Sequence, residues 1–255
     1  MTKEFNQDRE SSDAIRFSLI VPAYNEQHYL PRLLASVNRA RSSYRGGSDA
    51  IEVIVADNCS TDATARVSAE LNCRVITVEK RVIAAARNGG ARAARGDVIC
   101  FVDADSQIHP DTFNAIDAAL ATGSIVAGAT GGRLERLSIG IGLTWALFSP
   151  MIWILGLDTG VVFCRREDYY AIGGYNENRL FAEDVQFLVD LKRLGRPRGQ
   201  RFMRVTSSPV ILSTRKFDKH GDWHSLKAMF SLPYWRLFSK CSLDGFVKSY
   251  WYEDR

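Results

Sequence analysis

Short apolar runs rich in β-branched residues alternate with amphipathic stretches through the first half of the chain. The apolar runs predict buried strands, and the stretches with a period near 3.6 residues predict helices. The expected strands are 17–22, 51–56, 74–78 and 98–102, and the expected helices are 29–41, 63–71, 84–94 and 110–122. Because strand and helix occur in turn, we expect an α/β fold of three layers, α/β/α, with a mostly parallel central sheet.

Polar clusters follow three of the expected strands, at residues 23–26, 57–58 and 103–107. Ligands bind beyond the carboxyl ends of the strands in sheets of this kind. We therefore expect a binding site where these three loops meet.

The third loop carries two carboxylates, Asp103 and Asp105, directly after a fully apolar strand. Carboxylates are costly to desolvate there unless they bind a positive charge. They would point to opposite faces of an extended strand, whereas a turn brings both to one opening. Hard oxygen ligands of this kind suit Mg²⁺ or Mn²⁺ carrying a phosphate. An ordinary acidic loop is the alternative that this motif alone leaves open.

The composition fits one large globular domain: 255 residues, 46% hydrophobic and 24% charged. The five cysteines are odd in number and form no C-x-x-C pair, which argues against a disulfide framework or zinc site and favours a reducing compartment. Residues 1–15 are polar, without a secretory signal, and are expected to form a flexible tail. We accordingly expect a cytoplasmic protein.

Charge is distributed unevenly along the chain. Residues 191–255 contain 14 lysines and arginines against five acids, while residues 1–190 contain 19 against 24. A basic C-terminal part predicts contact with phosphates or with anionic lipid on the inner face of a membrane. We expect no nucleic-acid partner, because no nucleic-acid-binding motif is present.

Six motifs in a fixed order resemble those of the GT-A glycosyltransferases of family 2, over roughly residues 16–220. They are LIVPAYNE at 19–26, VADNCSTDAT at 55–64, ARNGG at 86–90, GDVICFVDAD at 96–105, GGYNE at 173–177 and AEDVQFLVDLKRLGR at 182–196. The resemblance implies a GT-A domain at 16–220. Its Rossmann-like nucleotide-binding half would be 16–122 and its acceptor-binding half 123–220, followed by an aromatic and basic helical extension at 221–255.

The resemblance also implies a donor site. In it, Asp57 would hold the base, conventionally uracil, and Arg87 would lie near the pyrophosphate or base. Asp103 would contact ribose or metal-bound water. Apart from the resemblance, the segment 213–216, with the sequence STRK, could reach the diphosphate. The residues expected to bind the nucleotide-sugar are Pro22, Ala23, Tyr24, Glu26, Asp57, Arg87, Asp103 and Ala104.

By the same resemblance, Asp105 would bind the divalent cation, Mn²⁺ or Mg²⁺. Gln107 is a candidate further ligand, with helix capping or solvent exposure as its alternative. His220 is another candidate, and His224 a weaker one.

Asp184 is the expected general base, because its position matches the ED motif of the family. Transfer of a sugar to a hydroxyl group needs a base to accept the proton of that hydroxyl. A base opposite the leaving group gives direct displacement with inversion, as family 2 enzymes do. Glu183 would orient Asp184 or bind the acceptor. Acids are also common in a first helical turn, where they complement the helix dipole.

One residue departs from the family pattern: Cys59 stands where glycine is usual. If this turn needs a positive φ, a side chain there costs about 1 kcal/mol.

Residues 137–157 contain no charge over 21 positions, long enough to suggest a membrane span. A single crossing would separate the acids at 103–105 from Asp184, so we favour a buried or lid-like helix over contact with a membrane interface. Aromatic residues alternate with basic ones at 223–251. This tail fits a peripheral membrane helix, and a packed C-terminal helix or a dimer contact explains the same residues slightly better.

Other enzyme classes lack their signatures here. No G-x-G-x-x-G follows the first strand, which excludes a dinucleotide oxidoreductase, and VPAYNE is not the phosphate loop of a nucleotidyltransferase. The sequence therefore predicts a metal-dependent inverting glycosyltransferase that uses a nucleotide-sugar, with UDP-sugars first. The acceptor would be a glycan, a lipid-linked glycan or a small molecule. A catalytically silent sugar-nucleotide-binding or scaffold protein is the alternative.

Overall fold

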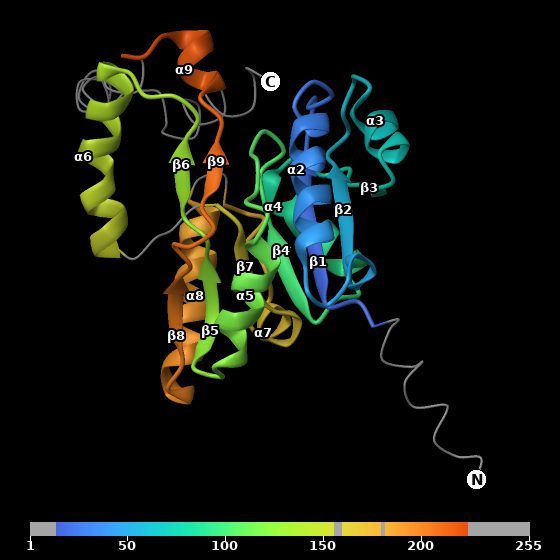
Figure 1. The fold of residues 1–255 in the computed structure, drawn as a ribbon, viewed down its shortest axis with the longest axis vertical. Helices are drawn as coiled ribbons and strands as arrows, with labels where there is room; N and C mark the ends of the chain where they lie inside the picture. Colours follow the sequence, from blue (N-terminus) through green and yellow to red (C-terminus); the bar gives the residue numbers. More distant parts are fainter. Residues whose placement is uncertain (1–13, 156–159, 180–181, 224–255) are drawn as a thin grey trace.

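The computed structural model describes residues 14–155, 160–179 and 182–223. Its central sheet has seven strands in the order β3-β2-β1-β4-β7-β5-β8 (Figure 1). Only β7 runs antiparallel to its neighbours in this sheet, so the predicted mostly parallel α/β fold is confirmed. The strands are β1 (Phe17–Ala23), β2 (Ile51–Asp57), β3 (Arg74–Thr77), β4 (Val98–Phe101), β5 (Ile125–Ala129), β7 (Val162–Arg165) and β8 (Arg201–Arg204).

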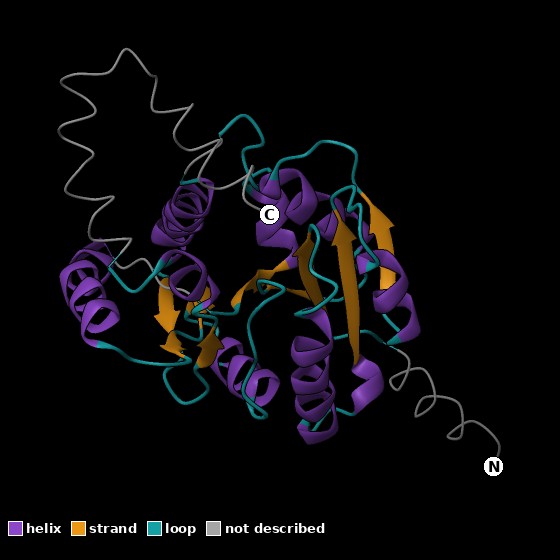
Figure 2. Cartoon of the chain, turned by 90° about the horizontal axis from the view of Figure 1, so that it is seen from above, coloured by secondary structure: helices purple, strands orange, loops and turns teal. Residues whose placement is uncertain are grey.

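Helices lie on both sides of this sheet (Figure 2). They are α2 (Leu30–Ser43), α3 (Thr64–Glu70), α4 (Ile83–Ala93), α5 (Thr112–Ala121), α7 (Arg166–Ala171) and α8 (Glu183–Gly195), with two 3-10 turns, Ser48–Ala50 and Arg196–Arg198. A second, two-stranded sheet pairs β6 (Gly132–Leu134) with β9 (Val210–Leu212), and α6 (Ile139–Leu155) and α9 (Arg215–His220) lie beyond it. The first four helices and first four strands agree with the predicted ranges within two residues at either end.

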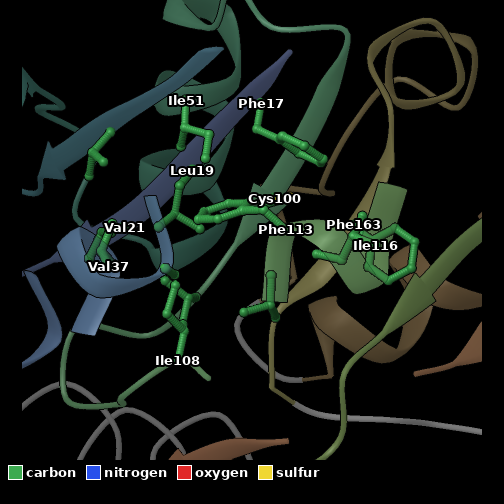
Figure 3. Close-up of a cluster of buried hydrophobic side chains, with 14 of the residues drawn as sticks. Phe17, Leu19, Val21, Val37, Ile51, Cys100, Ile108, Phe113, Ile116 and Phe163 are labelled. Carbon is green, nitrogen blue, oxygen red and sulfur yellow. The ribbon is translucent and has the colours of Figure 1, made fainter. Parts of the chain in front are cut away.

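The alternation of side chains along β1 divides the core into two layers. Phe17, Leu19 and Val21 pack in one hydrophobic cluster with residues of α2 and α5 (Figure 3). Ile20 points to the other face and packs in the cluster that contains residues of α4, α7 and α8. Since successive residues of a strand face opposite sides, a strand buried on both faces is expected to be mostly apolar. The one polar residue of β1, Ser18, is hydrogen-bonded to Glu52.

Two glycines let α4 approach the sheet closely. A Cβ on Gly90 would collide with the side chain of Ile20, and one on Gly89 would collide with Val78. Glycine inside a helix costs about 1 kcal/mol relative to alanine. In return, the glycines let the helix pack closely against the sheet. This packing places Arg87, on the same helix, at the carboxyl end of the sheet.

The helix α6 has one exposed and one buried face along the side chains that the structure describes. Ile139, Leu143 and Leu147 are 83%, 53% and 49% exposed, and they lie on one face because they recur every four residues. Ile141 and Thr144 are buried, so this stretch is only half-buried, and its expected lid-like role stays a prediction. Among the described residues, none of the helices combines the length and apolar character needed to cross a membrane. Residues 1–13, 156–157 and the tail 224–255 lie outside the described part, and with them most of the predicted terminal extensions.

Candidate functional site

The loops after β1 and β2 interlock at the carboxyl end of the sheet. The amide oxygen Oδ1 of Asn25 accepts a hydrogen bond from the backbone N–H of Thr61 (2.9 Å), and the N–H of Asn25 donates to Oγ of Ser60 (3.0 Å). Asn25 and Cys59 both adopt left-handed backbone, with φ of 54° and 59°. The positive φ expected at Cys59 is confirmed.

The predicted nucleotide-pocket residues of β1 and β2 are brought side by side. Ala23 and Asp57 are register partners at the ends of these parallel strands. Asp57 is 5% exposed, and one oxygen of its carboxylate accepts from the N–H of Ser60 (3.3 Å). Pro22 and Ala23 are buried, whereas Tyr24 lies at the rim with the guanidinium of Arg81 4.4 Å from its ring centre.

Arg87 of α4 joins the two halves of the candidate site, in what we call the Arg87 cluster (Arg87, Asp103, Tyr175 and Glu183). Its Nη1 donates to Oε1 of Glu183 at 3.1 Å, and its Nη2 lies 3.4 Å from Oδ1 of Asp103. The guanidinium also lies over the ring of Tyr175, 5.1 Å from its centre. The arginine thus connects the loop after β4 to the first turn of α8.

The two acids of the first turn of α8 have different surroundings. Burial raises the pKa of Glu183, and the opposing effect of the Arg87 charge is smaller. Asp184 is exposed, and its Oδ1 accepts from the N–H of Val185 at 2.8 Å. Ala182, which precedes both, has a left-handed φ of 56°. Glu183 is therefore held from within, while Asp184 faces outward.

Asn88 is a structural residue that the sequence analysis did not single out. Its amide nitrogen donates to the carbonyl of Tyr175 and to Oε1 of Glu177, both at 2.9 Å. Its Oδ1 accepts from the N–H of Tyr175 (2.9 Å) and from the hydroxyl of Tyr169. The ARNGG and GGYNE motifs, noted separately in the sequence, are thus joined through one asparagine.

Arg215 of α9 forms a second centre, the Arg215 cluster (Glu26, Tyr29, Asp105 and Arg215). Its Nη1 and Nη2 lie 2.6 and 2.8 Å from the two carboxylate oxygens of Glu26, which is 2% exposed. Its Nε lies 2.8 Å from Oδ2 of Asp105. The guanidinium also covers the ring of Tyr29 at 4.8 Å. The sequence analysis placed Arg215 near the diphosphate but missed both of its carboxylate partners.

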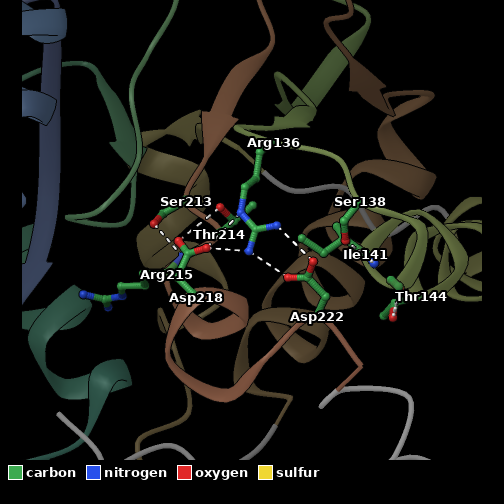
Figure 4. A network of polar contacts seen from close by, with 10 residues as sticks. Arg136, Ser138, Ile141, Thr144, Ser213, Thr214, Arg215, Asp218 and Asp222 are labelled. Carbon is green, nitrogen blue, oxygen red and sulfur yellow. Dashed lines mark hydrogen bonds and ion pairs between the residues drawn. The ribbon is translucent and has the colours of Figure 1, made fainter.

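A separate network fixes α9 in place. The guanidinium of Arg136 bridges the carboxylates of Asp218 and Asp222, with contacts of 2.5 to 3.1 Å (Figure 4). In the same view the side chain of Arg215 is directed away from this network. The position of Arg215 therefore depends on α9 being tied to the segment before α6.

Gln107 and the two histidines stay predictions as metal ligands. Gln107 pairs through its backbone with Ile211, its N–H and carbonyl bonding at 3.0 and 2.8 Å. This bridge ties the loop after β4 to β9. The side chain of His220 and all of His224 lie outside the described part of the chain.

The carboxylates of Asp103 and Asp105 have the right chemistry for a divalent cation. Mg²⁺ is held in proteins by one or two carboxylates while substrate phosphates fill other positions. Throughout the described ranges, no three histidine, cysteine, aspartate or glutamate side chains gather closely enough to hold a metal by themselves. A cation bound by these two carboxylates could take further ligands from a phosphate, and Ala104 between them is buried.

The two clusters, together with Asp184 beside the Arg87 cluster, make one group of charges at the carboxyl end of the sheet. Acids outnumber bases in this group, which leaves a formal charge of −3 and favours the binding of cations. The five carboxylates and two guanidinium groups are those of Glu26, Asp103, Asp105, Glu183, Asp184, Arg87 and Arg215.

The sequence of the first half matches a known family. The family model described as glycosyl transferase family 2 matches residues 18–138, just under half of the chain. Residues 18–138 thus have the sequence features of glycosyltransferase family 2. The matched region contains Asp57, Arg87, Asp103 and Asp105 and ends before Glu183 and Arg215.

Two curated relatives each match less than half of this chain. The putative glycosyltransferase EpsH of Bacillus subtilis is 34% identical over 99 residues, which are 37% of this chain and 27% of that protein. The poly(ribitol-phosphate) beta-N-acetylglucosaminyltransferase TarS of Staphylococcus aureus is 34% identical over 111 residues, 41% of this chain and 18% of TarS. The chain thus spans less than a third of the length of either relative.

Solved structures extend the similarity of fold over most of the chain. TarS residues 1–349 in complex with UDP-GlcNAc superpose with a TM-score of 0.61 at 22% identity, covering 78% of this chain and 59% of that one. The mannosyltransferase PcManGT of Pyrobaculum calidifontis, in complex with GDP-Man and Mn²⁺, gives 0.58 at 22% identity, covering 74% and 54%. The GT-A fold therefore extends over most of the chain.

Proposed function

We propose that this protein transfers a sugar from a nucleotide-sugar, with UDP-sugars first, to a hydroxyl group of an acceptor, with inversion. The observation that carries the proposal is the Arg87 cluster. Arg87 contacts Asp103, in the loop where the donor is expected, and Glu183, next to the expected base. Residues from positions 87, 103 and 183 would then form one site, as transfer between two bound substrates requires.

Each residue of the pocket would have a distinct part in binding the donor. The buried carboxylate of Asp57 would accept a hydrogen bond from the base, and Tyr24, covered by Arg81, would close the rim. Arg87 would direct positive charge toward the diphosphate. A bound divalent cation would stabilise the negative charge that develops on the leaving nucleoside diphosphate. The complexes of TarS with UDP-GlcNAc and of PcManGT with GDP-Man and Mn²⁺ support a nucleotide-sugar and a cation in such a fold.

Asp184 would accept the proton of the acceptor hydroxyl. It is exposed, and only one of its oxygens is bonded to a backbone N–H in the described contacts. Glu183 would keep its neighbour in position, since it is buried and held by Arg87. The acceptor could be a glycan, a lipid-linked glycan or a small molecule. The proposed peripheral membrane contact would go with a lipid-linked acceptor.

Calorimetric titration of UDP, with and without Mn²⁺, tests the donor site. We expect Mn²⁺ to strengthen UDP binding by roughly tenfold or more, and Asp105→Ala to abolish that gain. Asp97→Ala is the matched control, because Asp97 precedes the same strand at its opposite end and is exposed. Release of UDP from UDP-sugars, measured with the same proteins, then tests transfer or hydrolysis.

The results separate the competing functions. Binding of GDP but not UDP would keep the proposed reaction and change the donor. The catalytically silent sugar-nucleotide-binding protein would be favoured by a different result. In that case the protein binds nucleotide-sugars, it turns over none of them on any acceptor, and Asp184→Asn does not change the binding.

A further inference from the structure

Asp105, the residue expected to bind the cation, is already paired with a cation of the chain itself. Nε of Arg215 lies 2.8 Å from Oδ2 of Asp105, within the range of a charge-assisted hydrogen bond. The Asp105 side chain is 19% exposed, and so is that of Arg215. A divalent ion and this guanidinium cannot both occupy the same edge of the carboxylate.

The other side of the guanidinium is held more firmly. Nη1 and Nη2 contact both oxygens of Glu26, a bidentate pair whose carboxylate side is 3% exposed. Glu26 is itself fixed, because its N–H donates to Oγ1 of Thr64 at 2.8 Å. Loss of the single Nε contact would leave the bidentate pair intact, so Arg215 can release Asp105 without leaving its place.

We infer that Arg215 is an internal counter-cation that holds Asp105 in the absence of ligand and gives way to a divalent ion arriving with a nucleoside diphosphate. The identity of that ligand rests on the proposed function. The competition itself rests on the contacts of Arg215 and can be tested without any nucleotide.

The charge balance explains why the exchange would depend on the phosphate. When Arg215 releases Asp105, it stays paired with Glu26, and the divalent ion takes its place on Asp105. Two cations then lie beside one pair of carboxylates, Glu26 and Asp105. The negative diphosphate offsets the added positive charge, and it gives the freed Nε edge of Arg215 an anion to contact. Without the diphosphate, the metal must displace Arg215 with no such compensation. Arg215 therefore makes metal binding conditional on the donor.

The experiment measures Mn²⁺ binding to the nucleotide-free protein, by the loss of the electron paramagnetic resonance signal of free Mn²⁺. We expect Arg215→Met to bind Mn²⁺ at least roughly tenfold more tightly than the unmodified protein, because a unit charge next to the ligating oxygen has been removed. The double variant Arg215→Met/Asp105→Asn should lose the gain. Arg32→Met is the matched control: it removes an arginine that pairs with Glu135 at 2.6 Å and touches neither carboxylate.

Arg215→Lys gives a second, conservative variant. Its single ammonium group cannot reproduce the fork that spans Glu26 and Asp105, so Mn²⁺ affinity should fall between those of the unmodified protein and Arg215→Met. Circular dichroism checks that each variant is folded.

Equal or weaker Mn²⁺ binding by both Arg215 variants would overturn the inference, as would an equal gain in Arg32→Met. Failure of the proposed function would give a different result from failure of this inference. A protein that binds Mn²⁺ more tightly on loss of Arg215, yet never binds UDP or GDP, would keep the counter-cation and refute the glycosyltransferase.

Discussion

Two buried glutamates lie at opposite ends of the strands of the central sheet, and their surroundings shift their pKa values in opposite directions. Glu52, near the amino end of β2, accepts from Oγ of Ser18 and from the N–H of Arg95, both at 2.6 Å, and from Nε of Arg95 at 3.0 Å. Burial alone would raise the pKa of Glu52, but these hydrogen bonds outweigh it and lower the pKa. Glu183, at the carboxyl edge, has its pKa raised by burial despite its contact with Arg87.

Backbone strain also differs between the amino edge and the carboxyl edge of the sheet. Three of the four non-glycine residues with positive φ in the described ranges lie at the carboxyl edge: Asn25, Cys59 and Ala182. Strained backbone persists where the surrounding structure enforces it, commonly at functional sites. The amino edge is thus built to satisfy its charges, whereas the carboxyl edge keeps charge and strain that a ligand could relieve.

Breaking the Arg87 cluster should have the largest effect. Arg87→Met leaves the buried carboxylate of Glu183 without its ion-pair partner, and we expect a loss of about 3 kcal/mol in the free energy of unfolding. Urea denaturation followed by circular dichroism measures it. Arg66→Met is the control, because Arg66 and Glu70 form an exposed pair within one helix and should contribute less than about 0.5 kcal/mol. Equal losses in the two variants would show that Arg87 does not hold the halves together.

Neutralising each glutamate in turn sharpens the comparison between the edges. We expect Glu52→Gln to cost about 1 to 2 kcal/mol at neutral pH, because it removes a charged acceptor from buried donors. Glu183→Gln should cost less than Glu52→Gln, since burial already disfavours the ionised form of Glu183 and Arg87 keeps its contact with Asp103. Unfolding is measured from about pH 3.5 to pH 7.

The difference in stability between the unmodified protein and each variant should also depend on pH, with opposite sign for the two variants. The folded-state pKa of Glu52 lies below its ordinary value of 4.5, so its stabilisation is present above that value and is lost as the pH falls through the folded-state pKa. The folded-state pKa of Glu183 lies above 4.5, so its contribution is complete below 4.5 and is lost as the pH rises through the folded-state pKa. Parallel pH profiles for the two variants would contradict the comparison.

Relieving strain at the carboxyl edge should have the smallest effect. Cys59→Gly is expected to raise the free energy of unfolding by about 0.5 to 1 kcal/mol, because glycine adopts positive φ without a Cβ penalty. Thermal unfolding measures the gain. Cys59→Ala removes the thiol but keeps the Cβ, and it should give no gain. A loss in both variants would mean that the contact of the thiol with the carbonyl of Val78 matters more than the strain.

The N-terminal elements could be predicted because their signals are local. Each strand from β1 to β4 is a short apolar run followed by a helix of regular period, and the residues of the donor loops follow each strand directly. Even the positive φ of Cys59 could be anticipated from one unusual residue in a motif. These features depend on neighbours in sequence.

The remaining features depend on contacts between distant residues. Nothing near Asp105 indicates that its partner is Arg215, and nothing near Arg87 points to Glu183, 96 positions away. Which face of α6 is exposed could not be predicted either, because an uncharged helix has the same sequence whether or not the fold covers a given face. Ion pairs and burial of this kind are decided by topology, and local pattern does not determine them.

The placement of β7 has a consequence for how the chain is assembled. Within the described sheet, β5 is hydrogen-bonded only to β7 and β8, and β7 also closes the outer edge of β4. A nascent chain that has emerged only as far as residue 138, where the family match ends, would hold one strand with no partner and another with an open edge. Sheet closure must wait for sequence-distant segments, a slow type of pairing. The region that is easiest to recognise is therefore not an independent folding unit, and a boundary chosen for recombination at its end would cut through the sheet.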